Sequence, residues 1–485
     1  MIEERNYYQR NRFRIAEDIL YDSPEEECGI FGVYSTKKID TFSLVQFGLF
    51  ALQHRGQEAC GFSVLKDGVI NTVKQEGLVL DAFKSVENTE DYLGNAAVGH
   101  TRYTTAGDKK RYNFQPLFAK NQYDKTILSV VHNGNLVCVE PVRKKLEEEG
   151  ISFLATSDTE LMLRLIQRHL KKGIENAIKD AVKNIKGAYS VMTLTKDKLV
   201  AFRDPNGIRP LCIGVIDEHT YVLASESCAL DGVGAQFFRD VLPGEMIIID
   251  EEGLKSEMIF EETQQRICSF EYIYFARPDS IIENIEVHRV RVESGERLYK
   301  QNPVEADIVI GVPDSGVPAA IGYSKVSGIP FMPVLIKNRY IGRSFIIPTQ
   351  EMRERIVNLK LNPIHSEIKG KRIVIIDDSV VRGTTSKRLV KILKEAGAKE
   401  IHFRSASPQI IAPCFLGIDT PNKEHLISAR KTKDELKEFL QVNSLDFLSL
   451  ENLYEILRSK NHCFGCFTEE YPVNKDNCKV NISAL

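Results

Sequence analysis

Two stretches in the C-terminal half of the chain share one order of parts, and this order limits the fold more than any other feature. Each begins with an unbroken run of Val and Ile, continues through a loop rich in Gly, Ser, Thr and Asp, and ends in a helix-like segment. The two are DIVIGVPDSGVPAAIGYSK and RIVIIDDSVVRGTTSKRLVKILKEAGA. Strands without polar alternation are buried on both faces, which is typical of parallel sheets between helices. We therefore expect an α/β domain with a parallel sheet covered on both faces.

Residues 28 to about 260 have a different pattern, in which short β-rich runs alternate with helix-like stretches and Gly, Asn or Asp separates them. The runs are GIFGVYS, GFSVLK, AAVGHTRY, ILSVVHNG, YSVMTLT, LVAFRD, YVLASES and EMIIID. Apolar residues at helical spacing predict helices around 43–54 and at 158–171, with Ser157 or Asp158 as the cap of the second. This half is expected to hold stacked sheets and helices.

A chain of 485 residues is too long for one hydrophobic core, which predicts two domains. The change of pattern falls within 252–285, and residues 1–27 are polar and charged without a sustained period. The predicted parts are a leader (1–27), a first domain (28–260), a second domain (261–460) and a C-terminal tail (461–485).

Composition excludes some partners. The chain has 64 Lys and Arg against 67 Asp and Glu, so no charge excess favours nucleic acid or an anionic membrane. No apolar run approaches the ~20 residues that cross a bilayer, and the polar start lacks the hydrophobic segment of a secretory signal. We therefore expect a cytoplasmic protein with no nucleic-acid or membrane partner, whose ten cysteines form no disulfide framework.

The second Val/Ile stretch carries a candidate phosphate and sugar site. Its strand delivers Asp377 and Asp378 to the carboxyl end, where ligands bind in open α/β sheets. The helix start that follows offers backbone N–H groups to a phosphate, and residues 379–385 add hydroxyls and a glycine. Carboxylates suit sugar hydroxyls or Mg²⁺. An acidic helix cap would explain one aspartate, but not both together with the Gly-Thr-Thr turn.

This stretch resembles the 5-phosphoribosyl-1-pyrophosphate (PRPP) signature of the type I phosphoribosyltransferases. The resemblance implies that Asp377 and Asp378 hold ribose hydroxyls and the shell of a Mg²⁺ ion, with Ser315 as a further magnesium-associated position. Residues 379–385 would cradle the 5′-phosphate, and the loop at 311–316 would bind pyrophosphate. The implied PRPP-binding residues are Asp377, Asp378, Ser379, Arg382, Gly383, Thr384, Thr385 and Lys337.

Residues 337–353 lie between these two loops and carry four cationic side chains. Such a stretch is commonly a solvated face. Its place between two phosphate loops instead favours a mobile flap that neutralises pyrophosphate and excludes water when it closes.

Five polar motifs of the first half form a second candidate site: Cys28, LQHRGQE (52–58), GHTRY (99–103), VHNGN (131–135) and TSDTE (156–160). Together they resemble the class II glutamine amidotransferases, which have the αββα sandwich of the N-terminal-nucleophile hydrolases, and the match spans most of 28–260. The resemblance implies that Cys28 is the nucleophile, that Asn133 and Gly134 form the oxyanion hole, that Arg102 and Asp158 bind the α-carboxylate and α-amino group of glutamine, and that Arg55 and Gly56 shape the pocket floor. Neutral amide donors suit a developing oxyanion, and an Arg/Asp pair suits a zwitterion.

Cys28 follows three glutamates, and an acidic neighbourhood raises the pKa of a thiol. No Cys–His pair stands out, because His54, His100 and His132 have small neighbours that indicate packing or backbone bonding. In the family, the base is the α-amino group of the cysteine itself, and such a group titrates near ~7.7–8.0, close to working pH. That amine exists only if the Glu27–Cys28 bond is cut, so residues 1–27 are predicted to be a propeptide. A misassigned start codon is the alternative, but position 27 is Glu, so removal of a methionine cannot expose this thiol.

Four cysteines form a third group. The spacing Cys463-Phe-Gly-Cys466 presents two sulfurs to one metal and fits zinc, an iron–sulfur cluster or redox chemistry. Cys268 and Cys414 are candidates for the remaining ligands, because both lie next to distinctive sequence that is not typical of a core. Zinc, a cluster and four unrelated thiols all stay open from the residues alone. Cys60, Cys138, Cys212 and Cys228 are expected to be ordinary packing.

From Cys28 onwards nearly the whole chain resembles one family, the glutamine-dependent PRPP amidotransferases. One branch of that family carries a propeptide and a [4Fe–4S] cluster held by four cysteines, and Cys268, Cys414, Cys463 and Cys466 match those positions. The implied reaction converts glutamine, PRPP and water to 5-phosphoribosylamine, glutamate and diphosphate, the first committed step of purine biosynthesis, with ammonia passed from the Cys28 site to the PRPP site. The cluster would be structural or oxygen-sensing. The resemblance also implies a homotetramer and feedback inhibition by AMP, GMP, ADP or GDP.

Two alternatives remain. The same glutaminase is joined to other partners in glucosamine-6-phosphate synthase and asparagine synthetase, but neither uses the phosphoribosyl loop at Asp377 and Asp378. The other alternative is a non-catalytic nucleotide-sensing regulator with a phosphoribosyltransferase fold. The intact Cys28, Arg102 and Asn133 disfavour it.

Overall fold

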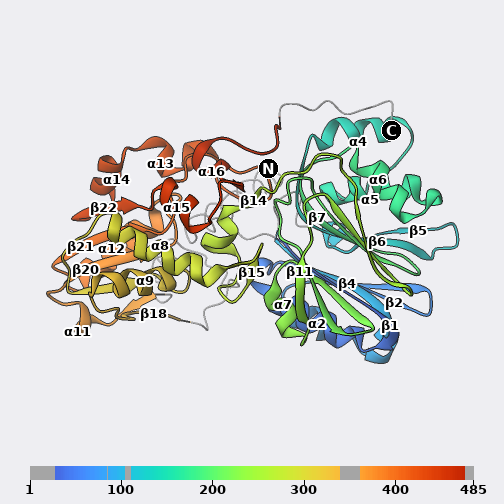
Figure 1. Cartoon of the computed structure of the whole chain (residues 1–485), viewed down its shortest axis with the longest axis horizontal. Coiled ribbons are helices and arrows are strands. Elements are labelled where there is room, and N and C mark those ends of the chain that lie inside the picture. The colour runs from blue at the N-terminus through green and yellow to red at the C-terminus, as the bar shows by residue number, and fades with distance from the viewer. Residues whose placement is uncertain (1–27, 85, 104–110, 339–360, 476–485) are drawn as a thin grey trace, which may run out of the picture.

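The computed structural model describes residues 28–84, 86–103, 111–338 and 361–475. Two halves lie side by side, a blue-to-green half with most of the antiparallel strands and a yellow-to-red half with a parallel sheet (Figure 1). The predicted leader and residues 339–353 of the predicted flap lie outside the described residues. Among the helices described, none combines the length and apolar character that a membrane crossing requires.

The first half contains two antiparallel sheets. The first sheet has the order β11 (Gln236–Asp240), β9 (Cys212–Asp217), β10 (Thr220–Ala224), β1 (Gly29–Ile39), β4 (Gly94–Arg102), β2 (Ala59–Lys66) and β3 (Val69–Glu76). The second has the order β13 (Gly253–Met258), β12 (Glu245–Asp250), β8 (Leu199–Arg203), β7 (Lys186–Leu194), β6 (Thr126–Val137) and β5 (Leu117–Lys120). All eight predicted runs correspond to strands, namely β1, β2, β4, β6, β7, β8, β10 and β12.

The two sheets pack face to face, and helices cover their outer faces. Buried side chains of both sheets meet in one cluster that includes Ile30, Val98, Val131, Met192 and Ile247. The helices α2 (Thr41–Ala51), α3 (Val79–Lys84) and α7 (Ser227–Gly232) contribute to the core outside the first sheet, and α4 (Val139–Glu148), α5 (Asp158–His169) and α6 (Ile174–Val182) to the core outside the second. The layers are therefore αββα, which confirms the predicted sandwich.

Both predicted helices of this half are present. Helix α2 begins at Thr41, directly after Asp40, whose carboxylate accepts the Ser43 N–H. The helix predicted around 43–54 therefore starts two residues earlier than expected. Gly48 of this helix lies against the ring of Phe31, where a Cβ would be 2.3 Å from the ring carbons. This close approach seats α2 on β1. Helix α5 begins at Asp158, directly after its N-cap Ser157, which puts the Asp158 carboxylate in the first turn.

The second half is built on a parallel sheet in the order β17 (Ile308–Gly311), β20 (Arg372–Asp377), β21 (Glu400–Ser405) and β22 (Ser444–Phe447). Alternate residues of its strands enter two clusters. Ile373 and Ile375 pack in the cluster that holds α12 (Thr384–Glu395) and α14 (Lys433–Leu440). Val374 and Ile376 pack in the cluster that holds α8 (Val287–Gln301), α9 (Val317–Ser327) and α15 (Leu450–Ile456). The predicted parallel sheet with helices on both faces is confirmed.

A short parallel pair joins distant parts of the sequence. β14 (Ile267–Cys268) pairs with β23 (His462–Cys463), so the C-terminal tail lies beside the segment that connects the two halves. The remaining short elements are β15 (Ile281–Ile282), β16 (Ile285–Glu286), β18 (Leu335–Lys337), β19 (Leu361–Pro363), α11 (His365–Ile368), α13 (Ile427–Arg430) and α16 (Gly465–Thr468).

Candidate active sites

Two loops meet at the carboxyl edge of the parallel sheet. Gly311 of β17 is paired with Ile376 of β20, so the loops that follow these neighbouring strands start side by side. The Ser315 hydroxyl of one loop donates to Asp378 Oδ2 of the other, and the Ser379 hydroxyl donates to Asp378 Oδ1 at 2.6 Å. Burial raises the pKa of Asp378, while these two hydroxyls oppose the rise. The structure thus brings Ser315 into contact with Asp378, two of the three residues predicted to hold Mg²⁺.

Two glycines allow this close approach. A Cβ at Gly316, just before α9, would lie 2.5 Å from the carbonyl oxygen of Ile376, which no side chain tolerates. Gly383 has φ of +75° at the start of α12, and a Cβ there would lie 2.7 Å from the Ile427 side chain. The helix start that was predicted to cradle a phosphate therefore depends on a glycine backbone.

The other predicted PRPP residues surround these loops. Thr384 is exposed and Thr385 half-buried in the first turn of α12, next to the half-buried Arg382. Lys337 ends β18, and its ammonium group lies 2.7 Å from the carboxylate of Asp314 in the pyrophosphate loop. The predicted flap therefore begins beside that loop.

In the first half, Cys28 directly precedes β1. Gly29 pairs with Thr101 of β4, and the Cys28 thiol donates to the backbone oxygen of Tyr103 at 3.4 Å. Burial raises the pKa of Cys28 to about 12, with the opposing influence of Arg102 and a further upward influence of Asp158. The thiol therefore stays protonated near neutral pH unless a base removes its proton.

Asn133 is fully buried in β6, yet neither its carboxamide oxygen nor its nitrogen has a hydrogen-bond partner among the described residues. Buried amides are nearly always satisfied, so an unsatisfied one calls for an explanation. Gly134 follows with φ of +143°, and a Cβ there would lie 2.0 Å from the Ala188 oxygen. The pair predicted to form the oxyanion hole thus combines a spare donor with a backbone that only glycine adopts.

The predicted glutamine-binding residues lie around the same strands. Arg102, at the end of β4, is buried, and its Nη1 donates to the backbone carbonyl oxygen of Asn113 at 2.5 Å. Asp158 Oδ2 accepts the Leu136 N–H at 2.8 Å. Burial alone would raise the pKa of Asp158, but His132 and the backbone N–H groups of Leu136 and Thr159 lower it. Gly56 packs against the backbone of β4, where a Cβ would lie 2.6 Å from Thr101 C.

The three histidines near the motifs have partners other than the thiol. His54 Nε2 lies 2.7 Å from Glu226, His100 Nε2 lies 3.2 Å from the His132 carbonyl oxygen, and His132 Nδ1 lies 3.3 Å from the Thr159 hydroxyl. Burial lowers the pKa of His100 well below its usual value. His100 thus has the predicted backbone partner, whereas His54 and His132 contact side chains rather than the backbone.

Arg55 was predicted to shape the pocket floor, and the structure shows partners that sequence reasoning missed. Its Nε donates to the Cys28 carbonyl oxygen at 3.3 Å, and its two Nη atoms contact Glu226 at 2.6 Å and Glu271 at 2.7 Å. Glu271 is separated from Arg55 by 216 positions. No local pattern signals such a pair.

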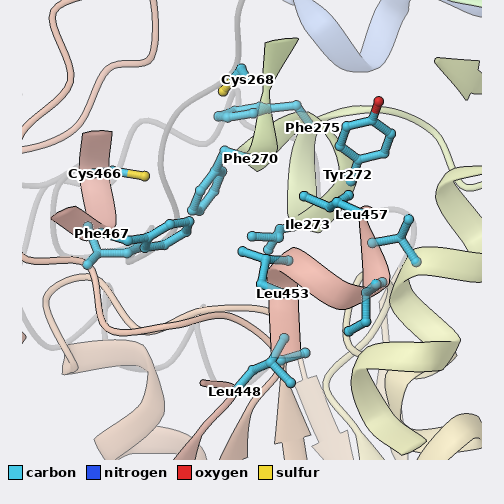
Figure 2. Packing of buried hydrophobic residues seen from close by; sticks show 14 of the residues in the cluster. Cys268, Phe270, Tyr272, Ile273, Phe275, Leu448, Leu453, Leu457, Cys466 and Phe467 are labelled. Atoms are coloured by element: carbon cyan, nitrogen blue, oxygen red, sulfur yellow. The ribbon is translucent and has the colours of Figure 1, made fainter. Parts of the chain in front are cut away.

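The four predicted ligand cysteines come together beside β14 and β23. Cys268 pairs with Cys463 in that parallel ladder, and backbone N–H groups of Ile411 and Ala412 donate to the Cys466 oxygen. The pKa of Cys466 is raised by burial and then by Cys268, Cys463 and Cys414, which places all four thiols in electrostatic range. Figure 2 shows Cys268 and Cys466 beside Phe270 and Phe467 in this packed region. Within the described residues, no three His, Cys, Asp or Glu side chains are arranged to hold a single metal ion.

Comparisons with known proteins cover both halves. A family model described as a glutamine amidotransferase domain matches residues 100–232, and one described as a phosphoribosyl transferase domain matches residues 287–406. An amidophosphoribosyltransferase of Synechocystis sp. is 45% identical over 93% of this chain and 92% of that protein.

Solved structures agree. A glutamine PRPP amidotransferase from B. subtilis, in complex with ADP and GMP, is 42% identical with a TM-score of 0.86, over 92% of this chain and 98% of that one. A structure described as the allosteric regulatory enzyme of purine biosynthesis is also 42% identical, with a TM-score of 0.88, over 94% of this chain and 99% of that one.

Proposed function

Because the chain belongs to the amidophosphoribosyltransferase family, we propose that it converts glutamine, PRPP and water to 5-phosphoribosylamine, glutamate and diphosphate. Ammonia released at the Cys28 site would be used at the PRPP site. The observation that carries the proposal is the presence of both sites in one chain. In the first, the buried Asn133 amide has no hydrogen-bond partner among the described residues, and Arg102 and Asp158 lie in electrostatic range of Cys28. In the second, Ser315 contacts Asp378 between the two predicted phosphate loops.

At the first site, the Cys28 thiol attacks the side-chain amide of glutamine, ammonia leaves, and water releases glutamate from the thioester. The Asn133 amide and the Gly134 N–H stabilise the oxyanion, and Arg102 and Asp158 bind the ends of the amino acid. Arg55 holds the Cys28 backbone through its carbonyl oxygen, which fixes the position of the nucleophile.

The base is the α-amino group of Cys28, and residues 1–27 are a propeptide cut from it. Two observations support this. The pKa of the thiol is raised to about 12, and the nearby histidines bond to other groups. An α-amine with a pKa near ~7.7–8.0 accepts a proton at working pH.

At the second site, Asp377, Asp378 and Ser315 would hold Mg²⁺, which neutralises the charge of the leaving diphosphate. The donor set fits a hard cation, because it consists of carboxylate and hydroxyl oxygens. Residues 379–385 bind the 5′-phosphate at the start of α12, and Lys337 approaches the pyrophosphate loop. Ammonia then attacks carbon 1 of PRPP as diphosphate leaves.

We infer that Cys268, Cys414, Cys463 and Cys466 hold a [4Fe–4S] cluster and that the protein belongs to the propeptide- and cluster-containing branch. The donor set is four soft thiols gathered at one place. A cluster here ties the tail to the junction of the two halves.

Regulation follows from the same relatives. The B. subtilis neighbour was solved with ADP and GMP, which supports binding of purine nucleotides to this protein. We propose that AMP, GMP, ADP and GDP inhibit it. A cytoplasmic homotetramer completes the proposal.

A pyrophosphate-release assay tests the function. Processed protein with Mg²⁺ is expected to release pyrophosphate from PRPP only when glutamine or ammonia is present, and Cys28→Ala should abolish only the glutamine-dependent part. If purified, processed and iron-loaded protein binds nucleotides but releases no pyrophosphate with either nitrogen source, the non-catalytic regulator is the correct reading.

A further inference from the structure

Five charged or chargeable side chains form an alternating row in the interior. Glu271 lies between two arginines, with Oε1 at 3.3 Å from Arg209 Nη1 and 2.7 Å from Arg55 Nη2. Arg55 then contacts Glu226 at 2.6 Å, and Glu226 contacts His54 at 2.7 Å. The side chains of Arg209, Glu271, Arg55 and Glu226 are all at most 1% exposed. Such buried charges are costly unless each is matched. Here Glu271 has an arginine on each side, and Glu226 lies between Arg55 and the His54 ring.

One end of the row lies beside the four cysteines. The backbone N–H of Cys268 donates to the oxygen of Ile208, the residue before Arg209. Burial alone would lower the pKa of Arg209, but Cys268, Glu271, Cys414 and Cys463 together raise it. Glu271 itself follows Cys268 by three positions, in the π-helical segment Glu271–Phe275. Arg209 therefore contacts Glu271 from a backbone position next to the residue that is hydrogen-bonded to Cys268.

The other side of the row reaches the nucleophile. Arg55 donates from Nε to the Cys28 carbonyl oxygen at 3.3 Å, and its Nη groups donate to Glu271 and Glu226. Two parallel contacts join Arg55 to Glu271, which fixes the plane of the guanidinium. A change in how Glu271 holds Arg55 therefore changes how Arg55 holds Cys28.

We propose that Glu271 is a positioning residue that couples the four-cysteine site to Cys28, because its carboxylate is shared by Arg209 beside the cysteines and by Arg55 at the nucleophile. Negative charge held by the cysteines attracts Arg209 and leaves more of the Glu271 charge to Arg55. When that charge is lost, Arg209 interacts more strongly with Glu271, and the contact between Glu271 and Arg55 weakens. The inference rests on the proposed nucleophile and cluster and goes beyond them.

Coupling between two sites is reciprocal, so modification of Cys28 must be felt at the cysteines. The test uses the anaerobic, processed holoprotein and a diazoketone analogue of glutamine, with mass spectrometry to confirm one label on Cys28. Labelling is expected to shift the visible circular dichroism of the iron–sulfur chromophore in the wild type. Glu271→Gln should abolish this shift while the iron content stays unchanged.

The matched control is Glu245→Gln. Glu245 is also a buried carboxylate bound twice by one arginine, Arg239, at 2.7 and 2.8 Å, but it lies outside the row. The Glu245→Gln protein should keep the full shift. Arg209→Lys retains the charge with a smaller perturbation of the packing and should keep a shift of the same sign, so it provides a second test if Glu271→Gln does not fold.

Activity gives an independent readout. The glutaminase kcat of Glu271→Gln should fall at least about tenfold, as expected when a nucleophile is misplaced, with ammonia-dependent activity unchanged. The inference alone would be overturned if labelling of Cys28 gave no shift in the circular dichroism of iron-loaded wild type, or an equal shift in Glu271→Gln. A wild type with no iron, or with Cys28 that does not react, would overturn the proposed cluster or nucleophile, and the inference with it.

Discussion

At the scale of single residues, the informative feature is a mismatch between burial and bonding. Asn133 is completely buried and its amide is unpartnered within the described part of the chain, whereas Asp158 and Arg102 nearby each have a bonded partner. A fold tolerates such an amide where a ligand supplies the missing partner. The sequence motif VHNGN indicated these residues only through its resemblance to a family, since an asparagine in a strand has no distinguishing pattern of its own.

Asn133→Ala should therefore separate catalysis from stability. The glutaminase kcat is expected to fall by about 10²–10³, as for other lost oxyanion donors, while ammonia-dependent activity stays unchanged. The melting temperature should not decrease, because the described residues make no hydrogen bond to this amide. Steady-state kinetics and a thermal melt check both parts. A lower melting temperature with unchanged kcat would mean that the amide is structural.

The pH dependence of the glutaminase follows from its base. An α-amine accepts a proton only when neutral, so kcat/KM should decrease about tenfold per pH unit below its pKa of ~7.7–8.0. His100→Gln should not change the pH at which this decrease begins, because burial already holds the pKa of His100 well below its usual value. If kcat/KM of His100→Gln began to fall at a different pH, the assignment of the base would be contradicted.

At the scale of elements, the two halves differ in how much their sequence reveals. The strand–loop–helix units of the parallel sheet carry their functional groups within one continuous stretch, so the fold and its loops were both predictable. In the sandwich, β3, β5, β9, β11 and β13 were not among the predicted runs, and all of these except β9 are edge strands of the two sheets. Edge strands are partly exposed, as the pattern of β13 shows, so they lack the buried runs that mark central strands.

The contact between α9 and β20 leads to a prediction at the same scale. Gly316→Ala would place a Cβ 2.5 Å from the Ile376 oxygen and push the pyrophosphate loop away from Asp378. We expect a loss of about 1–3 kcal/mol of stability from this overpacking, together with a higher KM for PRPP. Glutaminase activity measured without PRPP serves as the control and should not change. An unaltered KM for PRPP would show that the loop is not part of the substrate site.

At the scale of the whole molecule, the decisive contacts join residues that lie far apart in sequence. Cys268 meets Cys463 across 195 positions of chain through the pairing of β14 with β23, and Arg55 meets Glu271 across 216. Cysteine positions were predictable from the resemblance, because thiols in these contexts are uncommon. The buried charges were not, since Arg and Glu are common and only the fold places them together.

The cysteine site makes a prediction for the assembled molecule. If the four cysteines hold the proposed cluster, Cys463→Ser should remove its iron and lower the melting temperature, because the tail would lose its anchor to the junction of the halves. Cys60→Ser is the matched control: Cys60 is also buried, but in the core of the first sheet, and its replacement should leave the iron content unchanged. Iron analysis and calorimetry decide. Equal iron content in both variants would exclude the four-cysteine site as the ligand set.

The central claim is that one molecule joins two sites and transfers ammonia between them. The most direct measurement supplies glutamine labelled with ¹⁵N in the side-chain amide, together with PRPP, Mg²⁺ and an excess of unlabelled ammonium, and follows the nitrogen in the product. The account predicts that the 5-phosphoribosylamine formed from glutamine carries predominantly ¹⁵N. A product that carries the isotope ratio of the bulk solution would contradict it.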